Sequence, residues 1–163
     1  MIARAALTVL LLATPLVAQE SGIALGARAP DAAVETLDGQ GAALARTSAG
    51  RPAVLYFWAT WCGNCRELEP AMAAAFKTHG SHVAFVGIAV SANQSVERVR
   101  RYTAEHYLGF THFYDRRGNG VEAYDVPATS YVVVLNAAGV VVYTGVGGKQ
   151  DLEAAIQKAL RQR

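Results

Sequence analysis

An unbroken apolar run that leads into two closely spaced cysteines constrains this chain more than any other feature. The run from Ala53 to Trp58 contains only aliphatic and aromatic side chains, and its length suits a strand buried on both faces. After Cys62 the apolar residues recur at intervals of three and four, which is the period of a helix. The order strand, tight turn, helix therefore places Cys62 at the start of a helix.

The positions of the two cysteines predict redox chemistry. A cysteine at a helix N-terminus lies beside unpaired backbone N–H groups, which favour its thiolate form. We therefore expect Cys62 to be the nucleophile and Cys65, one turn further along, to be the more buried resolving thiol. Residues three apart on a helix need only slight tightening to form a disulfide. Because a bond that closes so short a loop stabilises a fold little, chemistry explains the pair better.

The first 18 residues have the pattern of a secretory signal peptide. Arg4 precedes a mostly apolar stretch, and Leu16-Val17-Ala18 resembles a cleavage site. We expect a mature chain that starts near Gln19. The alternative is an uncleaved membrane anchor, although the stretch is shorter than the roughly 20 residues of an ordinary span. Two cysteines alone in an oxidising compartment would normally pair.

Size and charge narrow the class of protein. Removing the leader leaves about 145 residues, which suits one domain with its own core. Removal of Arg4 lowers the formal net charge from +2 to +1. So small a charge does not favour nucleic acid as a partner.

The rest of the chain alternates strand and helix patterns. The turn Asp38-Gly39 predicts a short hairpin, and the apolar run 82–90 predicts a second buried strand, parallel to the first. A helix follows and ends near Gly109, with the solvated face formed by Arg98, Arg100, Arg101 and Glu105. The expected later elements are a strand at 110–114, a brief helix at 121–124, a hairpin of strands 129–135 and 140–144, and a closing helix near 152–160. Together they predict one mixed sheet covered by helices.

Several of these residues together resemble the thioredoxin superfamily. They are Phe57-Trp-Ala-Thr-Trp-Cys-Gly-Asn-Cys-Arg66, Pro70 five residues after the second cysteine, and Val126-Pro127 before a hairpin. The lead-in Gly26-Ala-Arg-Ala-Pro30 and the segment before Pro127 are similar to the exported TlpA/ResA-like branch. The resemblance covers most of residues 24–161. It implies a thioredoxin-like α/β fold with a central mixed sheet, an N-terminal hairpin and a β-α insertion before a cis-proline.

The resemblance also implies a site and a reaction. The residue matching Pro127 is cis in the family, so we expect a cis bond after Val126, with Trp61, Val126 and Pro127 contacting the substrate. Cys62 and Cys65 would reduce disulfides of exported proteins, such as apocytochrome c or copper-site assembly proteins, without cofactor or metal. A membrane thiol–disulfide carrier would supply the electrons. We therefore expect a monomeric, periplasmic thiol–disulfide oxidoreductase of this branch, with a role such as cytochrome c biogenesis.

The chain departs from the family pattern near the cysteines. Thioredoxins carry a buried acid six residues before the first cysteine, and here that residue is Tyr56. The exported branch often has Glu three residues after the second cysteine, where this chain has Leu68 between Glu67 and Glu69. Either glutamate is a candidate proton acceptor, and a solvated helix carboxylate is the ordinary interpretation of each. Asn64 replaces the usual proline, so the redox potential cannot be copied from the family.

Rival functions make different demands on the same residues. A zinc site would use the cysteines with His79-x2-His82, but finger spacing needs three to five residues between the histidines. Peroxiredoxins share the fold and need a Pro-x-x-x-Thr-x-x-Cys setting, which Thr60-Trp-Cys62 does not supply. We expect the four histidines to be surface or edge residues. Two alternatives stay open, a non-enzymatic metal-handling or assembly factor and a disulfide-forming oxidant.

Overall fold

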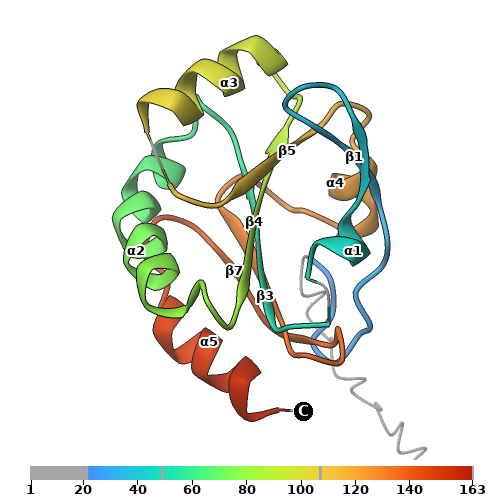
Figure 1. Ribbon diagram of the computed structural model, residues 1–163, viewed down its shortest axis with the longest axis vertical. Coiled ribbons are helices and arrows are strands. Elements are labelled where there is room, and N and C mark those ends of the chain that lie inside the picture. The colour runs from blue at the N-terminus through green and yellow to red at the C-terminus, as the bar shows by residue number, and fades with distance from the viewer. Residues whose placement is uncertain (1–21, 49, 107, 163) are drawn as a thin grey trace, which may run out of the picture.

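The computed structural model describes residues 22–48, 50–106 and 108–162. They form a seven-stranded mixed sheet with helices on both faces (Figure 1). The predicted signal peptide, residues 1–18, lies outside the described residues. The strands are β1 (Ala33–Thr36), β2 (Gly41–Ala43), β3 (Ala53–Trp58), β4 (Ala84–Val90), β5 (Thr111–Asp115), β6 (Tyr131–Leu135) and β7 (Val141–Val146). The helices are α1 (Leu44–Thr47), α2 (Gly63–His79), α3 (Val96–Glu105), α4 (Asn119–Ala123) and α5 (Leu152–Arg161). The predicted mixed sheet covered by helices is confirmed.

Strand β3 is an interior strand of the sheet, next to the middle strand β4 in the order β2-β1-β5-β4-β3-β6-β7. It pairs in parallel with β4, from Ala53 opposite Ala84 to Trp58 opposite Ala89, and antiparallel with β6. Every residue of β3 is buried, because alternate side chains enter the two cores on opposite faces of the sheet. The predicted strand buried on both faces is therefore confirmed. Burying each of its large side chains contributes roughly 1.5–3 kcal/mol to the stability of the fold.

The helices divide between the two faces of the sheet. Helices α2, α3 and α5 pack on the face that holds Tyr56 and Trp58, whereas α1, α4 and the lead-in cover the face that holds Leu55 and Phe57 (Figure 1). The predicted stripe of α5 is confirmed, since Leu152, Ala155, Ile156 and Ala159 are all buried. One face of the sheet thus carries the helix that begins at the cysteines.

Both predicted hairpins are present. Strands β1 and β2 pair antiparallel around a turn in which Gly39 has φ +84°, a conformation that favours glycine. Strands β6 and β7 also pair antiparallel, with Tyr131 opposite Val146. The segment between β4 and Pro127 contains α3, β5 and α4, and β5 joins the sheet between β4 and β1.

The expected cis bond before Pro127 is wrong. Described peptide bonds include no cis bond, so the one between Val126 and Pro127 is trans. The loop turns instead through positive φ angles at Asp125 (+46°) and Ser130 (+64°). Trans is also the intrinsic preference of an X–Pro bond, by about 0.5–1 kcal/mol.

Two of the four histidines are not the surface or edge residues that we expected. His79 is buried, and its Nε2 lies 2.8 Å from Glu153 Oε2, which links α2 to α5. The Nδ1 atom of His112 is also buried, with its ring stacked on Phe110 at a centroid distance of 4.7 Å. Glu153 lies 74 positions from His79 in sequence, which is why local pattern did not reveal that contact.

Candidate active site

The cysteine pair lies at the start of α2, just after the turn that follows β3. Cys62 is the N-cap of α2, and its Sγ accepts a hydrogen bond from the Cys65 amide at 3.0 Å. The two residues form a disulfide, with Cα atoms 5.2 Å apart. Cys62 is 5% exposed and Cys65 1% exposed, so Cys62 is the more exposed residue of the pair. The N–H groups at this end of α2 favour a thiolate at Cys62 once the bond is reduced.

Trp61 is an exposed aromatic residue beside this pair. Its side chain is 41% exposed, and its Nε1 donates to the Ala92 carbonyl at 2.8 Å. The hydrogen bond fixes the indole against the loop between β4 and α3. A large apolar surface held next to a reactive cysteine suits contact with another protein chain.

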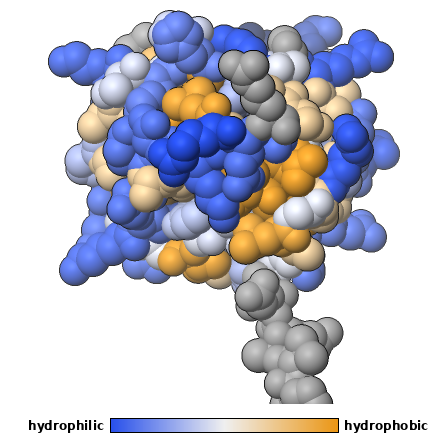
Figure 2. All heavy atoms as spheres, turned by 90° about the horizontal axis from the view of Figure 1, so that it is seen from below, coloured by the Kyte–Doolittle hydropathy of each residue, from blue (hydrophilic) through white to orange (hydrophobic). Residues whose placement is uncertain are grey.

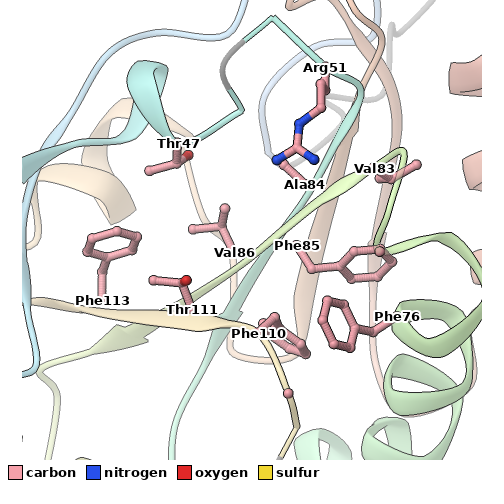
Figure 3. Close-up of a pocket in the computed structure, with 12 residues that line it drawn as sticks. Thr47, Arg51, Phe76, Val83, Ala84, Phe85, Val86, Phe110, Thr111 and Phe113 are labelled. Atoms are coloured by element: carbon pink, nitrogen blue, oxygen red, sulfur yellow. The ribbon is translucent and has the colours of Figure 1, made fainter.

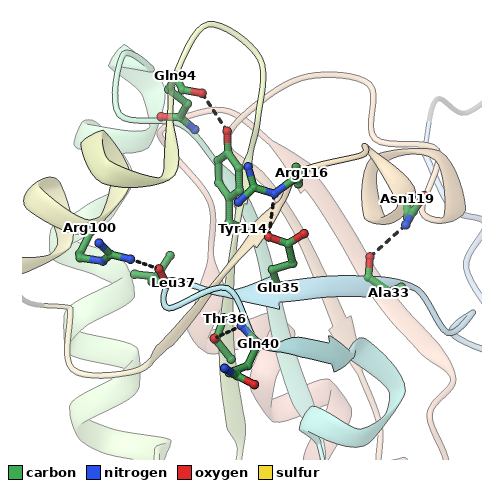
Figure 4. Close-up of polar contacts among 10 residues, drawn as sticks. All are labelled: Ala33, Glu35, Thr36, Leu37, Gln40, Gln94, Arg100, Tyr114, Arg116 and Asn119. Atoms are coloured by element: carbon green, nitrogen blue, oxygen red, sulfur yellow. Dashed lines mark hydrogen bonds and ion pairs between the residues drawn. The ribbon is translucent and has the colours of Figure 1, made fainter.

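Gln94, which no sequence motif identified, joins the active-site loop to the rest of the sheet. Its Oε1 accepts from the Thr60 amide at 2.9 Å, and its Nε2 donates to the Val90 carbonyl at 2.5 Å. The Gln94 carbonyl in turn accepts from the Tyr114 hydroxyl at 2.9 Å (Figure 4). The turn between β3 and Cys62 is therefore held by contacts from both β4 and β5.

Tyr56, at the place where thioredoxins carry a buried acid, lies beneath the cysteines. Its hydroxyl donates to the Cys65 carbonyl at 3.3 Å, and the residue is 1% exposed. Burial and the nearby Glu69 carboxylate raise the pKa of Tyr56 well above its ordinary value. Tyr56 is thus a protonated hydrogen-bond donor to the redox helix, which a carboxylate at this place would not be.

The two glutamates near the cysteines differ in their surroundings. The Glu69 side chain is 16% exposed, its Oε1 accepts from the Tyr102 hydroxyl at 2.5 Å, and its Oε2 lies 3.4 Å from His106 Nδ1. Glu67 is 48% exposed and lies 3.8 Å from Lys149. The expected solvated carboxylate therefore describes Glu67, whereas for Glu69 it is wrong because α3 covers it.

Val126 and Pro127 lie at the same end of the sheet as the cysteines. Phe57, near the end of β3, is opposite Tyr131 at the start of β6, so the loop before β6 meets the loop after β3. In the described part of the chain, no hydrogen bond joins either residue to Cys62 or Cys65. The register thus brings this loop to the active-site end without a direct polar contact.

The histidines of the rival zinc site lie far from the cysteines. Cys65 and His79 are 14 positions apart in α2, which corresponds to about 21 Å at 1.5 Å per residue. His79 also pairs with Glu153 on α5. Among the residues that the structure describes, no group of three or more His, Cys, Asp and Glu side chains could hold a metal ion.

The fold and the cysteine pair define a thiol–disulfide oxidoreductase of the thioredoxin superfamily, as comparison with known proteins bears out. Residues 25–145 match the model of the AhpC/TSA family, and the chain belongs to that family. It is 32% identical over 138 residues to the thioredoxin-like protein YneN of Bacillus subtilis, a match that covers 83% of this chain and 80% of YneN.

Two further similarities agree with the predicted TlpA/ResA-like branch, which is confirmed. The thiol-disulfide oxidoreductase ResA of Halalkalibacterium halodurans is 28% identical over 129 residues, covering 77% of this chain and 70% of ResA. The crystal structure of a putative thiol:disulfide interchange protein DsbE from Chlorobium tepidum superposes with a TM-score of 0.75 at 26% identity, covering 85% and 99% of the two chains. Within the described residues, no helix has the length and apolar character needed to cross a membrane.

Proposed function

We propose that this protein is exported and reduces disulfides in partner proteins by dithiol–disulfide exchange through Cys62 and Cys65. The observation that carries the proposal is a disulfide at the N-terminus of α2 with the exposed Trp61 beside it. The leader pattern of residues 1–18 supports export to the periplasm. The names of the related proteins support thiol–disulfide chemistry.

The proposed exchange has two steps. In the reduced protein, the Cys62 thiolate attacks one sulfur of a partner disulfide, forming a mixed disulfide and releasing the other partner sulfur as a thiolate that takes up a proton. The Cys65 thiolate then attacks Cys62 Sγ and releases the second partner thiol. Two electrons and two protons pass to the partner, and the Cys62–Cys65 disulfide of the structure is the product.

The roles of the neighbouring residues follow from their positions. Trp61, Val126 and Pro127 form the docking surface, since all three lie at the cysteine end of the sheet. We propose Glu69 rather than Glu67 as the proton acceptor for Cys65, because its partly buried carboxylate acts on Tyr56, whose hydroxyl contacts Cys65.

The electron donor in this proposal is another protein, because the chain has no Gly-rich dinucleotide motif opening a βα unit. The resemblance to the TlpA/ResA-like branch suggests that this donor is a membrane thiol–disulfide carrier. The acceptors are disulfide-bearing exported proteins such as apocytochrome c or copper-site assembly proteins. The protein would act as a monomer. A disulfide-forming oxidant is the second candidate, since Asn64 changes the dipeptide between the cysteines.

The reduction potential of the Cys62–Cys65 couple decides between the two directions. It is measured by equilibrating the purified mature protein in graded glutathione or dithiothreitol buffers and trapping the thiols. A potential near −250 mV or lower, close to the about −270 mV of thioredoxin, would support the reductant, and one near the about −120 mV of DsbA would make the protein an oxidant. Stoichiometric zinc binding without disulfide formation would exclude both.

A further inference from the structure

A hollow of about 320 Å³ lies beside the active-site loop and is lined by Thr60, Arg98, Arg101, Tyr102 and Glu105. We call it the arginine hollow. Thr60 belongs to the turn between β3 and Cys62, and the other four residues come from α3. The hollow therefore lies between the redox turn and the helix that follows β4.

The arginine hollow is fixed in place next to the cysteines. The Thr60 amide donates to Gln94 Oε1, and Gln94 directly precedes Ser95, the N-cap of α3. Thr60 itself is 5% exposed, and its hydroxyl has no hydrogen-bond partner within the described residues. Because that hydroxyl oxygen is itself buried, the polar groups that a ligand in the hollow could reach are the side chains of α3.

The arginines of α3 differ in what they contact. Arg100 donates to the Leu37 carbonyl (Figure 4). It also lies 3.7 Å from Asp38 and is not among the residues that line the hollow. Arg98 and Arg101 are exposed, and no carboxylate among the described residues lies within 4.0 Å of either. On the predicted solvated face of α3, Arg100 is therefore ion-paired, whereas Arg98 and Arg101 form no ion pair with a described residue and line the hollow.

Other charges around the hollow leave it positive. Glu105 contributes one carboxylate to the lining, and Glu69 is occupied by Tyr102 and His106. Arg66, exposed in the first turn of α2, lies close enough to Tyr102 to oppose the rise in its pKa. The lining itself therefore holds two arginines, Arg98 and Arg101, against the one carboxylate of Glu105, while the opposite charges of Arg66 and Glu69 nearby offset each other.

We propose that the arginine hollow receives acidic side chains that flank the disulfide of the protein substrate. The proposal rests on the proposed function, because it names the substrate class of that same site. A guanidinium recognises a carboxylate through two parallel hydrogen bonds, and Arg98 and Arg101 have these donors free of ion pairs. The exposed Trp61 provides an apolar contact next to them.

The position of the hollow favours an acidic protein segment over nucleic acid. The segment would enter two residues away from Cys62, where the partner disulfide must lie during attack, and Glu105 would repel a continuous run of phosphates. The exchange itself is unchanged. Because these charges are exposed, we expect them to act mainly on the encounter rate and on its salt dependence.

The test compares two disulfide-bearing peptides that differ only in Asp or Asn at the positions flanking one half-cystine. We measure kcat/KM for their reduction by the full mature protein, kept reduced by dithiothreitol, at low and high salt. We expect the wild type to prefer the Asp peptide, with the preference lost at high salt. Arg98→Gln and Arg101→Gln should each lower kcat/KM for the Asp peptide by about two- to fivefold, the range of an exposed ion pair, and Glu105→Gln should raise it.

Arg100→Gln is the matched control, since it removes the same charge from the same helix outside the hollow. Thermal melts confirm that each variant is folded. Failure to reduce either peptide would contradict the proposed function itself. Reduction of both peptides at equal rates, or an equal loss in Arg100→Gln and Arg98→Gln, would overturn the arginine hollow while leaving the reductase intact.

Discussion

The two ends of the sheet each carry a hollow, and the larger one is at the end without the cysteines. That hollow of about 600 Å³, the phenylalanine hollow, lies where β4 and β5 begin and is lined in part by Phe76, Phe85 and Phe110 (Figure 3). Arg51 is the charged residue among its described lining residues. Figure 2 shows the molecule from below, where apolar patches alternate with hydrophilic side chains.

The comparison shows that size alone does not identify a reactive site. The phenylalanine hollow arises because β5 pairs with β4 only from Val86 onward, which leaves Ala84 and Phe85 without a β5 neighbour. Aromatic rings line the hollow that remains, with Phe76 and Phe85 at a centroid distance of 5.4 Å. At the other end, the carboxyl ends of the parallel strands hold the cysteines, as is usual for sites of open α/β sheets.

The largest expected effect is at the cysteine end. Cys62→Ser should reduce disulfide turnover to the background rate of the buffer thiol, because the attacking thiolate is gone and the remaining Cys65 is only 1% exposed. Cys65→Ser should instead accumulate a mixed disulfide between Cys62 and the partner, since nothing resolves it. Both are read on non-reducing gels with a disulfide-bearing peptide substrate. Trapping through Cys65 in the Cys62→Ser protein would reverse the assigned roles.

At the phenylalanine end a substitution should cost stability and leave chemistry unchanged. Phe85 is buried, so Phe85→Ala should lower the free energy of unfolding by about 3–5 kcal/mol. The rate per folded molecule and the reduction potential should stay at their wild-type values. Phe85→Leu, which leaves a smaller cavity, is the control and should cost less. A changed potential in the folded Phe85→Ala protein would show that the two ends are coupled.

The sequence predicted the parts of the molecule that depend on local periodicity. Strand β3, the helix that begins at Cys62 and both hairpins follow from apolar spacing and turn residues. The contacts that shape the site escaped prediction because their partners are remote in the chain. Glu69 meets Tyr102 33 positions away, and Thr60 meets Gln94 34 positions away. Which remote side chains meet is decided by the packing of the whole domain, and a short stretch of sequence carries no information about that packing.

The smallest expected effect concerns His112, which lies between the two ends of the sheet. Its ring stacks on Phe110 of the phenylalanine hollow and meets Trp58, at the cysteine end of β3, edge-on at 5.3 Å. Burial lowers the pKa of His112 from 6.5 to about 4. His112 therefore becomes protonated below about pH 6.5 in the unfolded chain, but only near pH 4 in the folded protein.

This difference has a definite sign. Above about pH 6.5 His112 is neutral in both states, and the free energy of unfolding has its full value. As the pH falls, protonation of the unfolded chain lowers the free energy of unfolding, by about 3 kcal/mol when pH 4 is reached. Urea unfolding of wild type and His112→Leu between pH 7 and 4 should show a shallower pH dependence in the variant, whatever its absolute stability. Carboxylates titrate in both proteins and cancel in the difference. Equal slopes would mean that folded His112 takes up its proton as readily as the unfolded chain, which requires the ring to leave Trp58 and Phe110 in acid.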